Sequence, residues 1–167
     1  LNCAVWLEDG IEVPILSHSR LHAGGGVENV TSLGRKAAIS GWIRTRVVAR
    51  TIDSIVRMYS LGESAVLVVK LDLEGAEPHA FRGARETIGS GRAVFLFEDH
   101  AGDASHASTK AAIEAGLQVF AFDEGGLRLV REASDAGYYK AGIKAGGVNF
   151  VAVAPRAHRQ QRKVAAC

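Results

Sequence analysis

The chain has 167 residues, of which 47% are apolar and 23% are charged. This length suffices for one hydrophobic core and is short for two, so a single soluble domain is expected. The net charge is only +2, and part of the excess lies in residues 156–167, so no basic face indicates binding to nucleic acid. No segment has the length and apolar character of a membrane span. The two cysteines, Cys3 and Cys167, form neither a metal-binding spacing nor a disulfide framework, which favours a reducing cytoplasm.

The first residues are typical of two short strands. Residues 2–6 (NCAVW) resemble a strand end, and Glu8, Asp9 and Gly10 supply a turn into residues 11–16 (IEVPIL). This pattern predicts a hairpin, with its second strand confined to a sheet edge by Pro14.

A strand and a helix are predicted next. Residues 42–49 (WIRTRVVA) have the β-branched composition of a strand. Apolar residues then recur at helical spacing, with Thr51 as the N-cap and Gly62 as the stop. We therefore expect a helix that packs on the sheet.

The stretch AVLVVKLDLEGAE, residues 65–77, carries the strongest functional signal. Its aliphatic run at 66–69 does not alternate with polar residues, which indicates a strand buried on both faces of a parallel sheet. Four charged residues follow, and Pro78 then opens a helix; they are Lys70, Asp72, Glu74 and Glu77. Open α/β sheets bind ligands at the carboxyl ends of their strands, so this is the expected functional site. For Glu77, a role as a plain helix start remains the alternative.

The next helix and strand complete a parallel unit. Phe81, Ala84 and Ile88 form the buried stripe of the helix, and Gly83 in its interior indicates close backbone packing. The buried strand 93–97 follows and ends in Glu98, Asp99 and His100. A strand, helix and strand in this order predict two parallel strands with a right-handed crossover, whose acidic ends meet at one edge.

The remainder predicts mainly strands. A short helix through residues 113–116, capped by Ser105 or Ser108, precedes strands at 118–123, 127–130 and 149–154. Residues 132–147 are expected to form a surface loop. Residues 156–167 are expected to be a basic, disordered tail, which leaves residues 1–155 as the domain.

KLDLEGAE, followed by a helix with Phe81, Arg82, Gly83 and Ala84 and by the strand AVFLFEDH, resembles the carboxyl-terminal half of the FkbM family of S-adenosylmethionine-dependent methyltransferases. The family's usual form is KIDVEGAE, and residues 51–55 match its T-L-D-x-L segment. The resemblance implies an α/β protein with a partial Rossmann-like class I methyltransferase fold, whose mostly parallel sheet has one antiparallel strand near the C-terminus. The family's D-x-G-A-N-x-G cofactor loop does not occur here, so we expect the chain to be a carboxyl-terminal portion of the methyltransferase domain.

The resemblance also implies site residues. Asp72, Glu74 and His100 are the candidate catalytic residues, while Ala4, Lys70 and Asp72 are the candidates for binding S-adenosylmethionine. Ala4 matches the end of the family's third strand, beside the adenine. Similarity to metal-dependent O-methyltransferases adds a possible Mg²⁺ site formed by Asp72, Glu98 and Asp99. As alternatives, Glu98 or Asp99 caps the following loop, and His100 is a bystander rather than a base.

The expected reaction is methyl transfer to a hydroxyl of a small molecule, sugar or lipid, in the cytoplasm. The alternative is a noncatalytic remnant that acts as a binding module, including a homo-oligomer formed through the sheet edge that the family's first strand would cover. A Mg²⁺-dependent phosphotransfer enzyme fits less well, because no phosphate-cradling loop accompanies the aspartates.

Overall fold

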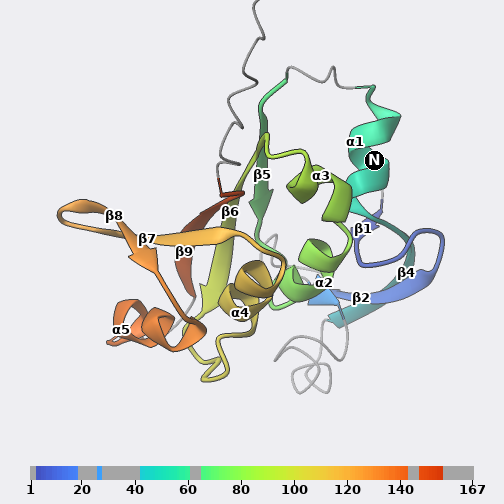
Figure 1. Cartoon of the computed structure of the whole chain (residues 1–167). Coiled ribbons are helices and arrows are strands. Elements are labelled where there is room, and N and C mark those ends of the chain that lie inside the picture. The colour runs from blue at the N-terminus through green and yellow to red at the C-terminus, as the bar shows by residue number, and fades with distance from the viewer. Residues whose placement is uncertain (1–2, 19–25, 28–41, 61–64, 143–146, 156–167) are drawn as a thin grey trace, which may run out of the picture.

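The protein is described by a computed structural model, which covers residues 3–18, 26–27, 42–60, 65–142 and 147–155. The described residues form an α/β structure with two sheets (Figure 1). The predicted tail at 156–167 lies outside these residues.

The smaller sheet has the strand order β1-β4-β2-β3. Its strands are β1 (Ala4–Val5), β2 (Glu12–His18), β3 (Gly26–Val27) and β4 (Trp42–Arg50). The predicted hairpin between the first two strands is wrong: β1 pairs in parallel with the end of β4, and β2 pairs antiparallel with the rest of it. The nine residues of β4 are long enough to pair with both strands. Pro14 does not confine β2 to an edge throughout, because β3 pairs with Ile15 and Leu16 on its other side.

Helix α1 (Ile52–Met58) begins where the sequence predicts. The Thr51 side chain accepts a hydrogen bond from the Ser54 amide at 3.0 Å. Asp9, in the turn between β1 and β2, accepts hydrogen bonds from the Thr51 amide at 2.8 Å and from the Ser54 hydroxyl at 2.6 Å. The helix start is therefore fastened to the smaller sheet.

The larger sheet has the strand order β5-β6-β9-β7-β8. Its strands are β5 (Leu67–Leu71), β6 (Ala93–His100), β7 (Gln118–Asp123), β8 (Gly126–Val130) and β9 (Gly147–Val153). β5 and β6 are parallel, as predicted, and β9 is antiparallel to both of its neighbours, β6 and β7. β7 and β8 form an antiparallel hairpin. The sheet is therefore mixed, and the expectation of a mostly parallel sheet is not met by the described strands.

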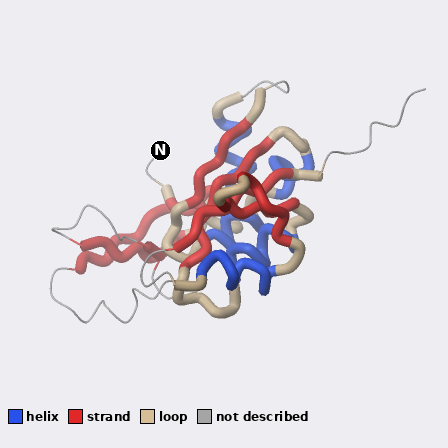
Figure 2. The backbone as a smooth tube through the Cα atoms, turned by 90° about the vertical axis from the view of Figure 1, so that its left-hand side faces the viewer, coloured by secondary structure: helices blue, strands red, loops and turns tan. Residues whose placement is uncertain are grey.

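β5 is an edge strand with one buried face. Leu67 and Leu71 are buried, whereas Val66 and Val68 are 73% and 69% exposed. The prediction of burial on both faces is wrong, because the described helices pack on only one face of this sheet (Figure 2). That face holds an aromatic core of Phe81, Phe95, Phe97 and Phe150.

The predicted helix after Pro78 is divided in two. α2 (Glu77–Arg82) ends at Gly83, and α3 (Arg85–Gly89) follows. The close packing expected at Gly83 is present, because a Cβ atom there would lie 2.2 Å from the carbonyl oxygen of Trp6. This contact brings the chain after β1 against the helices of the larger sheet.

The later helices differ from the sequence prediction in two ways. Neither Ser105 nor Ser108 caps α4 (Ala107–Glu114): its N-cap position is His106, whose side chain forms no capping hydrogen bond, and Asp103 accepts a hydrogen bond from the Ala107 amide at 2.8 Å. The predicted loop at 132–147 contains the 3₁₀ helix η2 (Ala133–Asp135) and α5 (Ala136–Lys140). Because the Lys140 side chain is buried there, this segment is part of the packed domain.

Candidate functional site

The candidate site lies at the carboxyl ends of β5 and β6. In the parallel register Leu71 is paired with Phe97, which places Asp72 beside Glu98 on the neighbouring strand. The two strand ends thus bring together carboxylates that are 26 residues apart in the sequence, as we predicted from the crossover connection.

The two carboxyl groups have pKa values shifted in opposite directions. A hydrogen bond from Lys70, whose Nζ lies 2.5 Å from Asp72 Oδ2, is the main cause that lowers the pKa of Asp72. Burial is the main cause that raises the pKa of Glu98, and the negative charge of Asp72 adds to it. The surroundings therefore favour the ionised form of Asp72 and the protonated form of Glu98.

Other predicted residues gather around Glu98. Glu74 and His100 both act electrostatically on the Glu98 carboxyl, Glu74 raising its pKa and His100 lowering it. His100 Nδ1 accepts a hydrogen bond from the Gly102 amide at 3.3 Å. Gly147 leaves the space that Glu98 occupies, because a Cβ at position 147 would lie 2.3 Å from Glu98 Oε1. The structure thus collects Asp72, Glu74, Glu98 and His100 at one edge.

Asp99 does not belong to this group. Successive side chains on a strand point to opposite faces, so Asp99 points away from Glu98. Its carboxylate is buried, pairs with Lys140 Nζ at 2.9 Å and accepts a hydrogen bond from the Thr109 amide at 3.2 Å. The three proposed Mg²⁺ ligands are therefore not brought together, and no cluster of three or more His, Cys, Asp or Glu side chains suited to a metal occurs among the described residues.

A cavity of about 300 Å³ opens beside Asp72, between the two sheets. This volume is at the lower end of the range for small-molecule sites. Ala4 and Asp72, both assigned to the cofactor by resemblance, line the same cavity, whereas Lys70 is not part of its lining. The other lining residues are apolar or glycine: Cys3, Val5, Ile15, Gly26, Val27, Val47, Leu73 and Ala76.

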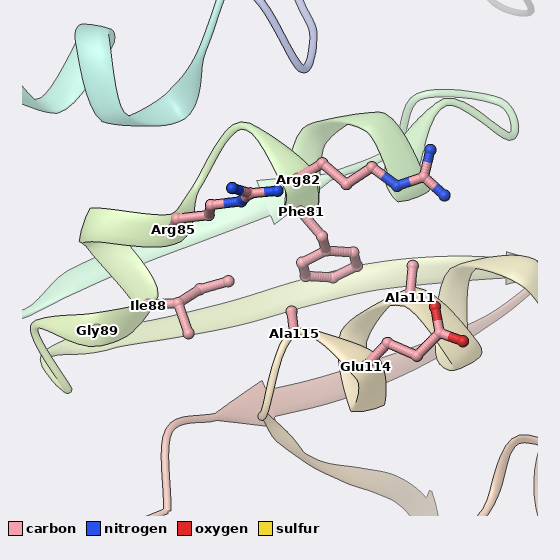
Figure 3. A pocket seen from close by; sticks show the side chains of 8 residues that line it. All are labelled: Phe81, Arg82, Arg85, Ile88, Gly89, Ala111, Glu114 and Ala115. Carbon is pink, nitrogen blue, oxygen red and sulfur yellow. The ribbon is translucent and has the colours of Figure 1, made fainter.

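A second cavity of about 300 Å³ lies on the helical face, between α2, α3 and α4 (Figure 3). Arg82, Arg85 and Glu114 stand around an apolar floor that includes Phe81 and Ile88. None of the predicted site residues lines it, and it lies away from the strand ends. We therefore take the cavity beside Asp72 as the candidate functional site.

Sequence reasoning missed the residues that complete the site. The apolar cavity walls from β2, β3 and β4 carry no motif, so only the folded chain identifies them. Lys140 was also missed, because it pairs with Asp99 across 41 residues and lies in a segment predicted to be a loop. No local pattern in the sequence signals either feature.

Comparison with known proteins adds no assignment: no protein-family model, no curated protein and no solved structure matches this chain. Among the helices of the described residues, none has both the length and the apolar composition that crossing a bilayer requires.

Proposed function

We propose that this chain supplies the carboxyl-terminal part of an S-adenosylmethionine-dependent O-methyltransferase domain of the FkbM type. The observation that supports this most is the position of Asp72. It is a carboxylate with a lowered pKa, at the end of a parallel strand pair, lining a cavity that also contains Ala4. The antiparallel strand β9, the last of the described strands, also agrees with the expected position of an antiparallel strand.

In this proposal Asp72 acts on the acceptor hydroxyl. An ionised carboxylate beside the hydroxyl orients it and accepts its proton as the methyl group is transferred. Lys70 stabilises the ionised form of Asp72 through its hydrogen bond, whereas burial and the charge of Asp72 favour the protonated form of the adjacent Glu98 carboxyl. Glu74 and His100 change the pKa of Glu98 and do not line the cavity.

S-adenosylmethionine would supply the activated methyl group. The apolar cavity suits its adenine, with Ala4 and Asp72 in the lining and Lys70 as the third candidate, held against Asp72. The D-x-G-A-N-x-G loop is absent from this sequence. In this proposal, residues outside the 167-residue sequence therefore make the remaining contacts with the cofactor. We propose no metal-dependent step, because Asp99 points away from Asp72 and Glu98. A cytoplasmic location, favoured by the cysteine content, belongs to the same proposal.

Isothermal titration calorimetry with S-adenosylmethionine tests this function. The 167-residue chain should bind weakly or not at all, and a protein that also includes coding sequence upstream of Leu1 with the glycine loop should bind tightly. Tight binding by the chain alone would show that the cofactor site is assigned wrongly. Upstream coding sequence without such a loop would count against the methyltransferase class.

The second candidate is a noncatalytic binding module. The observation in its favour is the exposed apolar surface at β5, where Val68 and the preceding residue Val66 face solvent at a sheet edge. In that case association through this edge should survive removal of the Asp72 charge, and neither the 167-residue chain nor a longer protein that includes it should transfer methyl groups.

A further inference from the structure

One wall of the cavity is the short turn between β5 and α2. Asp72, Leu73 and Ala76 all line the cavity from this turn. Leu73 packs against the hydrophobic clusters of both sheets, and Ala76 is buried in the cluster of the smaller sheet. The backbone conformation of the turn therefore determines both the shape of the cavity wall and the position of the Asp72 side chain.

The turn has an unusual backbone. Glu74 and Gly75 both lie in the left-handed region, with φ angles of 54° and 101°. Glycine adopts this region readily, but for a residue with a side chain it is unfavourable by roughly 1–2 kcal/mol. Such a conformation persists only where the surrounding structure holds it.

The Glu77 side chain supplies that support. Glu77 Oε1 accepts a hydrogen bond from the Leu73 amide at 2.7 Å, and Oε2 accepts one from the Gly75 amide at 2.9 Å. Ser108 on α4 donates to Oε2 at 3.4 Å. One carboxylate thus connects both sides of the left-handed turn to a helix on the face of the larger sheet.

The environment of Glu77 is unfavourable for a charge. Its side chain is 1% exposed, and burial raises its pKa, although the amide hydrogen bonds oppose that shift. A buried carboxylate is normally compensated by a cation. Within the described residues Glu77 forms no ion pair, and its hydrogen bonds go to backbone amides and one hydroxyl. A plain helix start does not require a carboxylate buried in this way, because a solvent-facing one serves the helix dipole equally well.

We propose that Glu77 is a positioning residue: its carboxylate holds the turn at residues 73–75 so that Asp72 faces the acceptor and Leu73 and Ala76 form the cavity wall. This role rests on the proposed methyl transfer, for which Asp72 is the reacting carboxylate. Glu77 itself touches neither the cavity nor the acceptor, since it acts through the backbone of the turn.

The test compares Glu77→Gln with Glu114→Gln in a Cys167→Ser background, in which Cys3 is the sole thiol. Glutamine can accept only through its oxygen, so at least one of the Leu73 and Gly75 amides loses its partner. We expect hydrogen exchange at that amide to accelerate by about tenfold or more, with exchange at Phe95 and Phe97 in the core unchanged. Alkylation of Cys3, which lines the same cavity, should change severalfold. Glu114 is exposed and remote from the cavity, so its variant should match the parent.

A wild-type measurement covers the case in which Glu77→Gln does not fold. In an NMR titration, the amide proton chemical shifts of Leu73 and Gly75 should change with pH together, because both amides donate to the Glu77 carboxylate. Their common midpoint should lie at a pH above the ordinary pKa range of glutamate. Separate midpoints, or a folded Glu77→Gln protein with unchanged exchange at both amides and unchanged Cys3 alkylation, would overturn the proposal. Neither readout requires methyl transfer, so an intact turn in a protein that binds no cofactor argues against the proposed function alone.

Discussion

The pKa values of Asp72 and Glu98 are shifted in opposite directions because the surroundings of the two groups differ. Lys70 donates to Asp72 and stabilises its charged form, whereas Glu98 is more buried and lies beside a negative charge. Neighbouring carboxyls with pKa values pushed apart are typical of sites that handle protons. The resemblance marks Asp72 as a candidate catalytic residue, and Glu98 only as a possible Mg²⁺ ligand or loop cap.

Removal of the Asp72 charge should change the titration of Glu98. In Asp72→Asn the pKa of Glu98 should move down toward its ordinary value without reaching it, since burial, the main cause, remains. Carbon-13 NMR of the side-chain carboxyls measures this directly. Glu114→Gln, an exposed residue of α4 on the helical face of the sheet, is the control and should leave Glu98 unchanged. An unchanged Glu98 in Asp72→Asn would show that the two carboxyls are not coupled.

The same shifts set the sign of the pH dependence. The lowered pKa of Asp72 contributes stability above its unfolded value, and this contribution is lost as the pH falls through the folded pKa. The raised pKa of Glu98 contributes stability below its unfolded value, which is lost as the pH rises through the folded pKa. The two contributions therefore change in opposite directions across the acidic range.

Catalysis should depend on Asp72 more than cofactor binding does. If the protein is the proposed methyltransferase, then in a form that includes a glycine loop Asp72→Asn should lower kcat by about 10²- to 10⁴-fold, the usual range for loss of a general base. The affinity for S-adenosylmethionine should change little, because asparagine keeps the shape and removes only the charge. Steady-state kinetics and calorimetry on the same preparation separate the two effects. If Asp72→Asn had the same kcat as the unmodified enzyme, the role of Asp72 would be structural and not catalytic.

Among the elements, the α2–α3 junction shows how backbone packing connects the two sheets. Gly83 ends α2 and lies against the Trp6 carbonyl, and the Trp6 ring stacks on His79 of α2 with ring centroids 3.9 Å apart. Asp53 of α1 accepts hydrogen bonds from the Glu86 and Thr87 amides and so holds the start of α3. The junction thus holds the two sheets together beside the cavity that Ala4 and Asp72 both line.

A methyl group at position 83 should disrupt this junction. Gly83→Ala places its Cβ 2.2 Å from the Trp6 carbonyl oxygen, a backbone atom that cannot move aside easily. We expect a loss of about 2–4 kcal/mol in the free energy of unfolding, in the upper range for overpacking. Gly89→Ala is the matched control, because no atom lies within 4 Å of its added Cβ. Denaturant unfolding measures the free energy of unfolding of both variants. Equal values would show that the α2–α3 junction accommodates the added methyl group without loss of stability.

At the scale of the whole molecule, the larger sheet has one face covered by helices and one open face, to which the described part of the chain contributes no helix. Residues on the open face follow the strand register, as in the row Lys70, Leu96, Val151 and Phe120 across four strands. Further exposed apolar side chains lie at both edges of the sheet: Val66 and Val68 beside β6, and Phe122, Leu127 and Leu129 on the β7–β8 hairpin. Edge strands of this kind are prone to pair with other chains.

Association of the chain should therefore depend on β5. Val68→Lys places a charge on the exposed side of the edge strand and should shift the protein toward the monomer at high concentration. Its effect on stability should stay within about 0.5 kcal/mol, because the side chain faces solvent. Sedimentation velocity measures the shift, with Leu129→Lys on the opposite edge as the control. Equal behaviour of the two variants would exclude β5 as the specific interface.

The sequence alone determined several local features, including which charged residues follow the strand ends. Thr51 predicts the start of α1, Gly83 predicts a close backbone contact, and the strand-helix-strand spacing predicts the parallel pairing that sets Asp72 beside Glu98. These features follow from local rules of capping, sterics and chain connection, which act over a few residues or one crossover.

Only the tertiary structure decided which side chains share a site. Asp99 points away from Glu98 and forms an ion pair with Lys140. The two strands of the expected hairpin, β1 and β2, each pair with β4 and not with each other. The apolar run at 66–69 indicates burial, but the strand order places it at an edge, where Val66 and Val68 face solvent. Burial and pairing between distant segments depend on the packing of the whole chain, so no local pattern of residues specifies them.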